Sequence, residues 1–285
     1  MRAVITAAGL GTRFLPVTKA IPKELLPVLD KPAIQYVVEE ALDSAAQAEA
    51  VLIVTNSSKP AIQAHFQPDP QLERQLIAAG KTQLAAGVRT VGALPVEFAF
   101  QAEPGGLGQA VACAGDWLRT APRPQEPFYV LLADALVPSA TVLPRLLATS
   151  RAHNGASVLA VLPVALEETR RFGVIAGESL AAAGEEGVWQ VRGLVEKPQD
   201  SPPSNLAVFG RYLLSPRILD ILEHTAPGVA GEIQLTDALV SLLAEEEIYA
   251  VEMDPEEGFD VGTSSEWLRT NLRLAARTAA YQDLF

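Results

Sequence analysis

The chain has 285 residues, of which 49% are hydrophobic and 20% charged, a composition typical of a globular protein with a sizeable core. Its formal net charge of −12 argues against nucleic acid and anionic membranes as partners, because both are bound through basic surfaces. The single cysteine, Cys113, excludes an internal disulfide, and no signal peptide or membrane-length apolar run is recognisable, so we expect a cytoplasmic protein.

The first half of the chain alternates strand and helix signals. Continuous apolar runs predict buried strands at residues 1–6, 50–55, 96–100 and 128–133. Helical spacing of apolar residues predicts helices at residues 34–45, 61–65, 70–79 and 105–118. This alternation indicates a βαβ-type sheet of mostly parallel strands.

From about residue 157 the pattern changes to strands joined by turns. Strand-like segments lie at residues 157–164, 172–177, 188–198 and 206–215, and we interpret them as a β-rich segment that caps the sheet. Further helices are predicted at residues 216–224, 232–246 and 265–281, with one strand at 248–253. We expect one compact unit with an inserted subregion.

The loop after the first predicted strand concentrates positive charge. The first 31 residues hold five basic and two acidic side chains, although the whole chain is acidic. Gly9 and Gly11 allow close approach of a ligand to the backbone, and they lie near Thr12, Arg13 and Lys23. Guanidinium and ammonium groups suit phosphate oxygens, so we expect this loop to bind a small polyanion.

Two other nucleotide motifs do not fit this loop. The sequence begins as G-x-G-x-x-G at Gly9, but Phe14 stands where the third glycine belongs, and no acidic residue follows at the usual distance. The P-loop pattern is absent from the sequence. A structural turn with incidental basic residues remains the alternative.

A second glycine-rich loop follows at Gly105–Gly108, just after Gln101. The glutamine amide offers both a donor and an acceptor, which matches the edge of a pyrimidine. The alternative is an ordinary surface loop ahead of a helix.

Charged residues also stand at the ends of predicted strands. Asp134 ends a buried strand and Asp260 follows another, so the two carboxylates are candidate ligands of one Mg²⁺ ion. Each aspartate could equally cap a helix or stabilise a turn. Glu196 and Lys197 close a strand in the β-rich part, where they could bind sugar hydroxyls and a phosphate, or form an exposed ion pair.

In order and spacing, these motifs resemble those of the bacterial UTP–glucose-1-phosphate uridylyltransferase (UDP-glucose pyrophosphorylase) family, in the sugar nucleotidyltransferase superfamily. The blocks that carry the resemblance cover nearly the whole chain: AAGLGTRFLPVTKAIPKELLPV, KPAIQYVVEEA, VTNSSKPAIQAHF, EPGGLGQAV, RRFGVI, GLVEKP, SNLAVFGRYLLSP and GEIQLTDAL. The resemblance implies an α/β, Rossmann-like fold with a mixed, mostly parallel sheet flanked by helices. Within one domain, 1–285, it implies a nucleotide-binding part (1–156), a β-rich sugar-binding part (157–231) and a C-terminal part with helices and a metal-binding loop (232–285).

The resemblance also implies the reaction. UMP would pass from UTP to glucose 1-phosphate by Mg²⁺-assisted in-line attack, giving UDP-glucose and pyrophosphate, in a homo-oligomer (a dimer or tetramer). The implied nucleotide-binding residues are Ala8, Gly9, Gly11, Thr12, Arg13, Gln101 and Gly106. The implied sugar-phosphate residues are Gly173, Glu196 and Lys197, the metal ligands are Asp134 and Asp260, and the catalytic residues are Arg13, Lys23, Asp134 and Lys197.

The chain departs from the family pattern at three places. Ala135 replaces a second acid after Asp134, Gln109 replaces a histidine, and Thr263-Ser264 replaces an ending that commonly includes a lysine. The Thr263 ending is similar to that of thymidylyltransferases, which leaves a dTTP-using or other sugar-1-phosphate nucleotidyltransferase as an alternative. An alternative of another class is a non-catalytic paralogue that binds nucleotide sugars.

Overall fold

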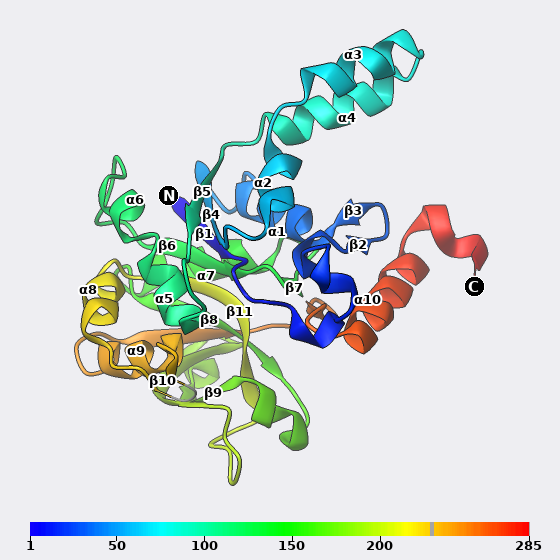
Figure 1. Ribbon diagram of the computed structural model, residues 1–285. Coiled ribbons are helices and arrows are strands. Elements are labelled where there is room, and N and C mark those ends of the chain that lie inside the picture. Colours follow the sequence, from blue (N-terminus) through cyan, green and yellow to red (C-terminus); the bar gives the residue numbers. More distant parts are fainter. Residues whose placement is uncertain (229–230, 285) are drawn as a thin grey trace.

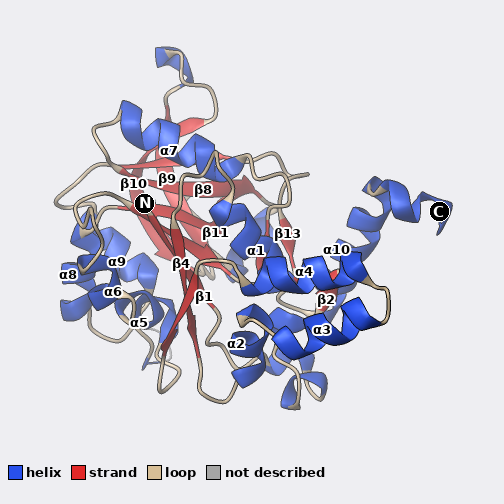
Figure 2. Ribbon diagram, turned by 90° about the horizontal axis from the view of Figure 1, so that it is seen from above, coloured by secondary structure: helices blue, strands red, loops and turns tan. Residues whose placement is uncertain are grey.

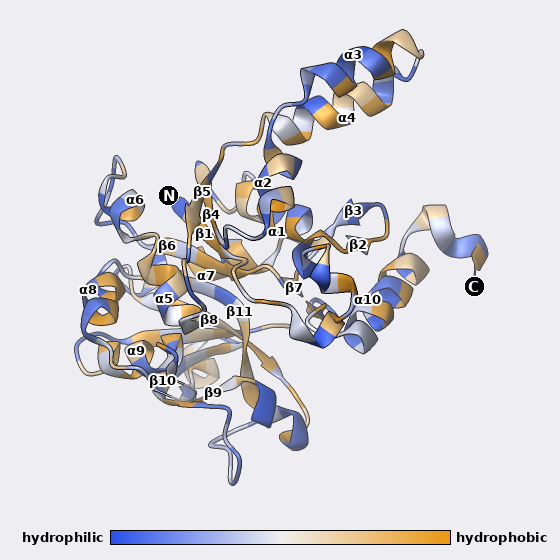
Figure 3. Ribbon diagram, in the orientation of Figure 1, coloured by the Kyte–Doolittle hydropathy of each residue, from blue (hydrophilic) through white to orange (hydrophobic). Residues whose placement is uncertain are grey.

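The computed structural model describes residues 1–228 and 231–284, and within these ranges a nine-stranded sheet of order β5-β4-β1-β6-β11-β8-β12-β10-β9 runs through the molecule (Figure 1). The sheet is mixed, as predicted, but it is not mostly parallel, because four of the eight neighbouring strand pairs within these ranges are antiparallel. Helices cover both of its faces, and its strands are the most continuously hydrophobic segments of the chain (Figures 2 and 3).

The strands of the first half pair in parallel. They are β1 (Arg2–Thr6), β4 (Ala50–Thr55), β5 (Val96–Phe100) and β6 (Phe128–Leu132). β1 lies in the centre, with Ala3 opposite both Val51 and Tyr129, and all three side chains are fully buried. Because these strands run in the same direction, the loops that follow β1, β4 and β6 lie at one edge of the sheet.

The strands of the second half extend this sheet, and the expectation that they cap it is wrong. They are β8 (Ser157–Pro163), β9 (Gly173–Ser179), β10 (Val188–Glu196), β11 (Leu206–Leu214) and β12 (Ile248–Glu252). β11 pairs antiparallel with both β6 and β8, and so joins the two halves. Only β8 and β12 pair in parallel in this part of the described sheet.

Each face of the sheet has its own hydrophobic core. On one face pack α1 (Ala33–Leu42) and α7 (Val142–Ala152). On the other face pack α5 (Gly106–Ala112), α6 (Gly115–Arg119), α8 (Arg217–His224) and α9 (Leu235–Leu242). The helix predicted at 232–246 is therefore shorter than expected, and α7 was not predicted.

Three further groups of elements lie outside these layers. After α2 (Pro60–Phe66), the hairpin of α3 (Pro70–Ala78) and α4 (Thr82–Gly92) projects from the body (Figure 1). α10 (Ser264–Arg277) lies on the other side of the opening loop, near the short strands β2 (Pro27–Val28), β3 (Lys31–Pro32), β7 (Ala135–Leu136) and β13 (Phe259–Asp260). Short 3₁₀ helices are η1 (Thr12–Phe14), η2 (Val17–Lys19), η3 (Lys23–Leu25), η4 (Leu166–Arg171), η5 (Ala181–Ala183) and η7 (Ala279–Leu284).

Candidate active site

The opening glycine loop turns sharply as it leaves β1. Gly11 has a φ of +66°, and a Cβ atom there would lie 3.1 Å from Cγ2 of Thr18, so the turn requires glycine. The hydroxyl of Thr18 donates to the carbonyl oxygen of Gly11 (2.8 Å) and fixes the turn. Gly9 has open space around it, which leaves its backbone accessible.

A cavity of about 270 Å³ opens beside this loop, and we call it the glycine-loop cavity. It collects predicted site residues from four separate segments: Ala8, Gly9, Lys23, Gln101, Gly106 and Asp134. Gly11 and Thr12 are outside its lining and form the turn into η1. Arg13 borders a neighbouring cavity instead.

The second glycine loop is shaped by close packing. Gly106 has a φ of +90°, and a Cβ atom there would lie 2.7 Å from the carbonyl oxygen of Ile233. Gln101 is buried, and its Nε2 donates to Gly106 O (3.2 Å) and to Oε1 of Gln109 (2.7 Å). Gln109, one of the departures from the family pattern, therefore orients the amide of Gln101.

A buried ion pair that the sequence reasoning missed lies beneath the glycine loop. The ammonium of Lys59 is 3.0 Å from both carboxylate oxygens of Glu24, and it also donates to the carbonyl oxygens of Ala7 (2.8 Å) and Gly9 (2.5 Å). Burial lowers the pKa of Lys59 and raises that of Glu24. The pair ties the loop to η3, which carries Lys23.

The two candidate metal ligands are brought together by short strands. Asp260 lies opposite Ala135 where β13 pairs with β7, and the backbone N–H of Val261 donates to the carbonyl oxygen of Asp134 (2.9 Å). Both aspartates border a cavity of about 300 Å³, the carboxylate cavity, together with Arg13 and Lys197. Ala135 is thus fixed in a strand pair, although it lacks the acid expected there.

The chemistry of these donors fits a small divalent cation. A Cβ atom built on Gly262 would lie 3.0 Å from Oδ1 of Asp260 and 3.5 Å from Oδ2 of Asp134, so both carboxylates border the same small space. Carboxylate oxygens are preferred ligands of Mg²⁺, which commonly keeps several waters and binds substrate phosphates. Among the described residues no group of three or more potential metal-ligating side chains occurs, so the two aspartates would be the protein's share of such a site.

Each aspartate is also paired with a cation. Lys23 Nζ lies 2.5 Å from Oδ2 of Asp134, and Arg171 Nη2 lies 2.5 Å from Oδ2 of Asp260. Burial favours the neutral form of Asp134, but the Lys23 ammonium, a backbone hydrogen bond and Arg13 together outweigh it and hold the pKa of the carboxyl below its ordinary value. For Asp260, burial dominates and raises the pKa.

The Glu196 cavity, of about 250 Å³, lies at the end of β10. Glu196 is opposite Gly173 in the β9–β10 pair, and its Oε2 accepts from the hydroxyl of Thr236 (2.6 Å). A Cβ atom on Gly173 would lie 3.1 Å from that hydroxyl and 3.3 Å from the carboxylate. Lys197 reaches back to Oε1 of Glu196 (3.1 Å) from a backbone with a φ of +44°.

The three cavities adjoin one another. Asp134 borders both the glycine-loop cavity and the carboxylate cavity, while Arg171 and Lys197 border both the carboxylate cavity and the Glu196 cavity. Cations lie along this line, with Lys23 at the glycine-loop cavity, Arg13 at the carboxylate cavity and Lys197 at both the carboxylate and the Glu196 cavities. The arrangement suits two phosphorylated molecules that meet near Asp134 and Asp260.

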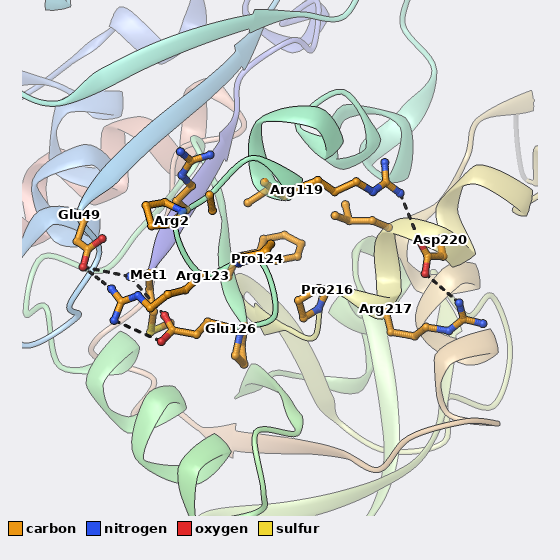
Figure 4. A pocket seen from close by; sticks show the side chains of 16 residues that line it. Met1, Arg2, Glu49, Arg119, Arg123, Pro124, Glu126, Pro216, Arg217 and Asp220 are labelled. Carbon is orange, nitrogen blue, oxygen red and sulfur yellow. Dashed lines mark hydrogen bonds and ion pairs between the residues drawn. The ribbon is translucent and has the colours of Figure 1, made fainter.

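A further cavity of about 330 Å³ lies at the opposite edge of the sheet, near the start of β1 (Figure 4). Three of its four arginines pair with carboxylates, whereas Arg2 donates to the carbonyl oxygen of Trp117 and lies over the Trp117 ring. Arg119 and Arg217 both pair with Asp220, and Arg123 pairs with Glu49 and Glu126. Most of the cationic groups around this cavity are therefore already engaged by carboxylates of the protein.

The departure at Thr263 has a structural role. Thr263 is the N-cap of α10, where its hydroxyl accepts from the backbone N–H of Glu266 (3.2 Å). The hydroxyl of Thr270 in the same helix donates to the carbonyl oxygen of Asp260 (2.9 Å). The helix cap and this bond together fix the segment that carries Asp260.

No helix among residues 1–228 and 231–284 is long and apolar enough to span a membrane.

Comparison with known proteins gives a consistent picture. The family model described as nucleotidyl transferase matches residues 2–277. UTP–glucose-1-phosphate uridylyltransferase of Bacillus subtilis (strain 168) is 42% identical over 99% of this chain and 93% of its own length. The enzyme of the same name from Streptococcus pneumoniae serotype 4 is 41% identical over 99% of this chain and 92% of its own length.

Solved structures of high similarity carry related names. UTP-bound UGPase from Acinetobacter baumannii superposes with a TM-score of 0.86 at 34% identity, and the match covers 99% of this chain and 96% of that one. A UDP-glucose pyrophosphorylase complexed with UDP-glucose superposes with a TM-score of 0.82 at 36% identity, covering 97% of this chain and 99% of that one.

Proposed function

Because this chain belongs to the nucleotidyl transferase family, within the group of UTP–glucose-1-phosphate uridylyltransferases, we propose that it transfers UMP from UTP to glucose 1-phosphate. The products are UDP-glucose and pyrophosphate. The observation that carries this proposal is the continuity of the three cavities through Asp134 and Lys197. A nucleotide in the first cavity and a sugar phosphate in the third would direct their phosphates towards the second.

In this proposal the nucleotide lies against the two glycine loops. Gly9, Gly11, Gln101 and Gly106, with Ala8 and Thr12 beside them, hold the uridine. Gly106 and Gln109 occupy both N–H groups of the Gln101 amide, so its oxygen is the group that accepts from the N–H at the edge of the pyrimidine ring. Arg13 and Lys23 neutralise the triphosphate, which is consistent with their place in an otherwise acidic chain.

The sugar phosphate lies in the Glu196 cavity. Glu196, fixed by the hydroxyl of Thr236, accepts hydrogen bonds from sugar hydroxyls, and Gly173 leaves room for the ring. Lys197 binds the phosphate. Because Lys197 also borders the carboxylate cavity, it aims this phosphate at the triphosphate rather than at solvent.

The reaction needs positioning more than proton transfer. A phosphate oxygen of glucose 1-phosphate attacks the α-phosphorus of UTP, the bond to the β-phosphate breaks, and pyrophosphate leaves with the bonding electrons. The attacking phosphate is anionic at neutral pH, so no general base is required. Mg²⁺ held by Asp134 and Asp260 would neutralise charge on the phosphates and on the departing pyrophosphate. The chain's own residues bring two polyanions into line and offset their repulsion.

The deciding experiment measures pyrophosphate release with UTP, dTTP, ATP and GTP, each offered glucose 1-phosphate and then galactose 1-phosphate. We expect turnover with UTP and glucose 1-phosphate, abolished by EDTA. Turnover with dTTP alone would favour the thymidylyltransferase alternative. Binding of UDP-glucose by folded protein without pyrophosphate release in either direction would favour the non-catalytic paralogue.

A substitution of Asp134 tests the metal assignment. Asp134→Asn should fold normally yet lose about a thousandfold in kcat, which corresponds to about 4 kcal/mol of barrier. Asp116→Asn, at an exposed position in α6, is the matched control and should leave the rate unchanged. Near-normal turnover of Asp134→Asn would exclude Asp134 as a metal ligand.

We also infer a homo-oligomer, a dimer or tetramer, that works in the cytoplasm. α10 exposes Leu268 (53%) and Leu272 (52%) one helical turn apart, which supports a role of this helix in subunit contacts. Light scattering coupled to size-exclusion chromatography tests this directly. A monomeric mass at micromolar concentration would contradict it.

A further inference from the structure

We propose that Arg171 has two successive partners in the reaction cycle: it neutralises Asp260 until a divalent ion takes that carboxylate, and it then binds the phosphate of the sugar substrate. The proposal rests on the function proposed above, and it adds a substrate-binding residue outside the expected set. Its first support is the ion pair itself, in which Nη2 of Arg171 lies 2.5 Å from Oδ2 of Asp260.

Each carboxylate oxygen of Asp260 already has a partner. Oδ1 accepts from the backbone N–H of Gly262 (2.6 Å), and Oδ2 is bound by Arg171. The Oδ1 bond belongs to the turn that follows β13, so it is part of the fold. A divalent ion on this carboxylate would bring a second cation beside the guanidinium and compete with it for Oδ2. The guanidinium belongs to a side chain, so it can leave without any change of the backbone.

The guanidinium has freedom to move. The side chain of Arg171 is 38% exposed, and it stands at the last residue of η4. Its other charged contact is weak, since Nη1 lies 3.9 Å from Oε1 of Glu168. An exposed arginine pair of this kind contributes little to stability, so exchanging its partner costs little.

The second proposed partner of Arg171 is a substrate phosphate, which would lie where two cavities meet. The residue borders both the carboxylate cavity and the Glu196 cavity, and the other cation at both is Lys197. The backbone N–H of Lys197 donates to the carbonyl oxygen of Phe172 (3.0 Å), so the segments that carry the two cations are joined. A phosphate at the junction of the cavities would meet Lys197 from one segment and Arg171 from the next. The planar guanidinium of Arg171 is suited to bidentate binding of phosphate oxygens.

The two roles predict effects of opposite sign for one substitution. Arg171→Gln removes the competitor from Asp260, so Mn²⁺ alone, followed by electron paramagnetic resonance without substrates, should bind about two- to fivefold more tightly. The same variant should raise KM for glucose 1-phosphate by about tenfold at saturating UTP and Mg²⁺, because a charged hydrogen-bond donor to the phosphate is lost. Arg171→Lys should recover part of both effects.

The controls separate this inference from the function beneath it. Arg192→Gln removes another exposed arginine, which lies on β10 and pairs with Glu178 on β9 (2.9 Å), and it should change neither quantity. If the wild-type protein binds no Mn²⁺, or if Asp260→Asn does not weaken that binding, the metal site of the proposed function is refuted. If wild type binds Mn²⁺ but Arg171→Gln binds it equally or more weakly, or leaves KM for glucose 1-phosphate unchanged, the role of Arg171 is refuted and the proposed function stands.

Discussion

Arg211 and Glu40 form a fully buried ion pair directly behind the loop that carries Asp134. Nε and Nη2 of Arg211 bind the two carboxylate oxygens of Glu40 at 2.9 and 2.7 Å. The same guanidinium donates to the carbonyl oxygens of Leu132 (3.4 Å) and Ala135 (2.8 Å), one on each side of Asp134. The pair therefore fixes the backbone on which the proposed metal ligand stands.

Breaking this pair should be costly. Arg211→Met leaves the carboxylate of Glu40 buried without a partner, and we expect a loss of about 3–5 kcal/mol in the free energy of unfolding, measured by urea denaturation. The double variant Arg211→Met, Glu40→Leu removes both charges and should recover most of that loss. Its kcat should still be reduced, because the carbonyl oxygen of Ala135 has lost its donor.

Kinetics of the double variant separate the two functions of the pair. Normal stability with normal kcat would mean that the pair does not position Asp134. Normal stability with a reduced kcat, and with KM for UTP unchanged, would support positioning.

The second buried pair should act on nucleotide binding. Lys59→Met removes the donor to the carbonyl oxygens of Ala7 and Gly9, so the glycine loop is no longer fixed from below. We expect the dissociation constant of UTP, measured by calorimetry, to rise by about tenfold or more. The double variant Lys59→Met, Glu24→Gln avoids an unpaired buried carboxylate and keeps the test valid if the single variant is unstable.

Lys81→Met is the matched control for this prediction, because Lys81 is exposed at the turn between α3 and α4. Its affinity for UTP should equal that of wild type. A folded Lys59 variant with wild-type affinity would show that the loop holds its shape without the ammonium.

Most of the strands and the approximate location of the site could be predicted from the sequence, because buried parallel strands appear as continuous apolar runs. β1, β4, β5 and β6 lie within one residue of their predicted bounds. The pairing of the later strands could not be predicted, since it depends on which distant segments meet. α4 was also missed, because in that helix only Ala85 is buried and the apolar pattern is weak.

The ion pair of Arg211 and Glu40 could not be predicted from the sequence, because the strand that carries Arg211 is irregular. The pairing of β11 shifts register between Val208 and Tyr212, and Gly210 there has a φ of +57°. Such an irregularity breaks the alternation of side chains along a strand. The face of the sheet to which Arg211 points therefore cannot be predicted from its place in the sequence. Its partner Glu40 is 171 residues away, and no local pattern links them.

Gly173 offers a test of sugar recognition that leaves the nucleotide untouched. In Gly173→Ala the new methyl group would lie 3.1 Å from the hydroxyl of Thr236 and 3.3 Å from Oε2 of Glu196. Both groups must shift, so KM for glucose 1-phosphate should rise by about tenfold, while KM for UTP stays within about twofold. Equal changes in both constants would contradict a role confined to the sugar.

The control for this variant is Gly193→Ala on the neighbouring strand β10. A Cβ atom there would come no closer than 3.9 Å to its nearest neighbour, the Cβ of Ala176. Both KM values should therefore match wild type.

The ion pair of Lys23 and Asp134 predicts a pH dependence of stability. Burial alone would raise the pKa of Asp134, but the Lys23 ammonium, with a backbone hydrogen bond and Arg13, lowers it from its ordinary value of 3.8. The folded state therefore binds the proton less tightly than the unfolded state. The stabilisation is then fully present above about pH 3.8 and is lost as the pH falls through the lower pKa of the folded state. The pKa of Lys23 is raised from 10.5, so the pair persists to at least that pH.

Comparison of wild type with Asp134→Asn by urea unfolding in EDTA measures this contribution. Wild type should be more stable between about pH 5 and 9, by a constant margin, because neither member of the pair titrates there. The margin should shrink below about pH 3.8, where the carboxylate begins to take up a proton and the pair is lost. A margin that grows on acidification would mean that the carboxyl has a raised pKa, and Lys23 would then not be its dominant partner.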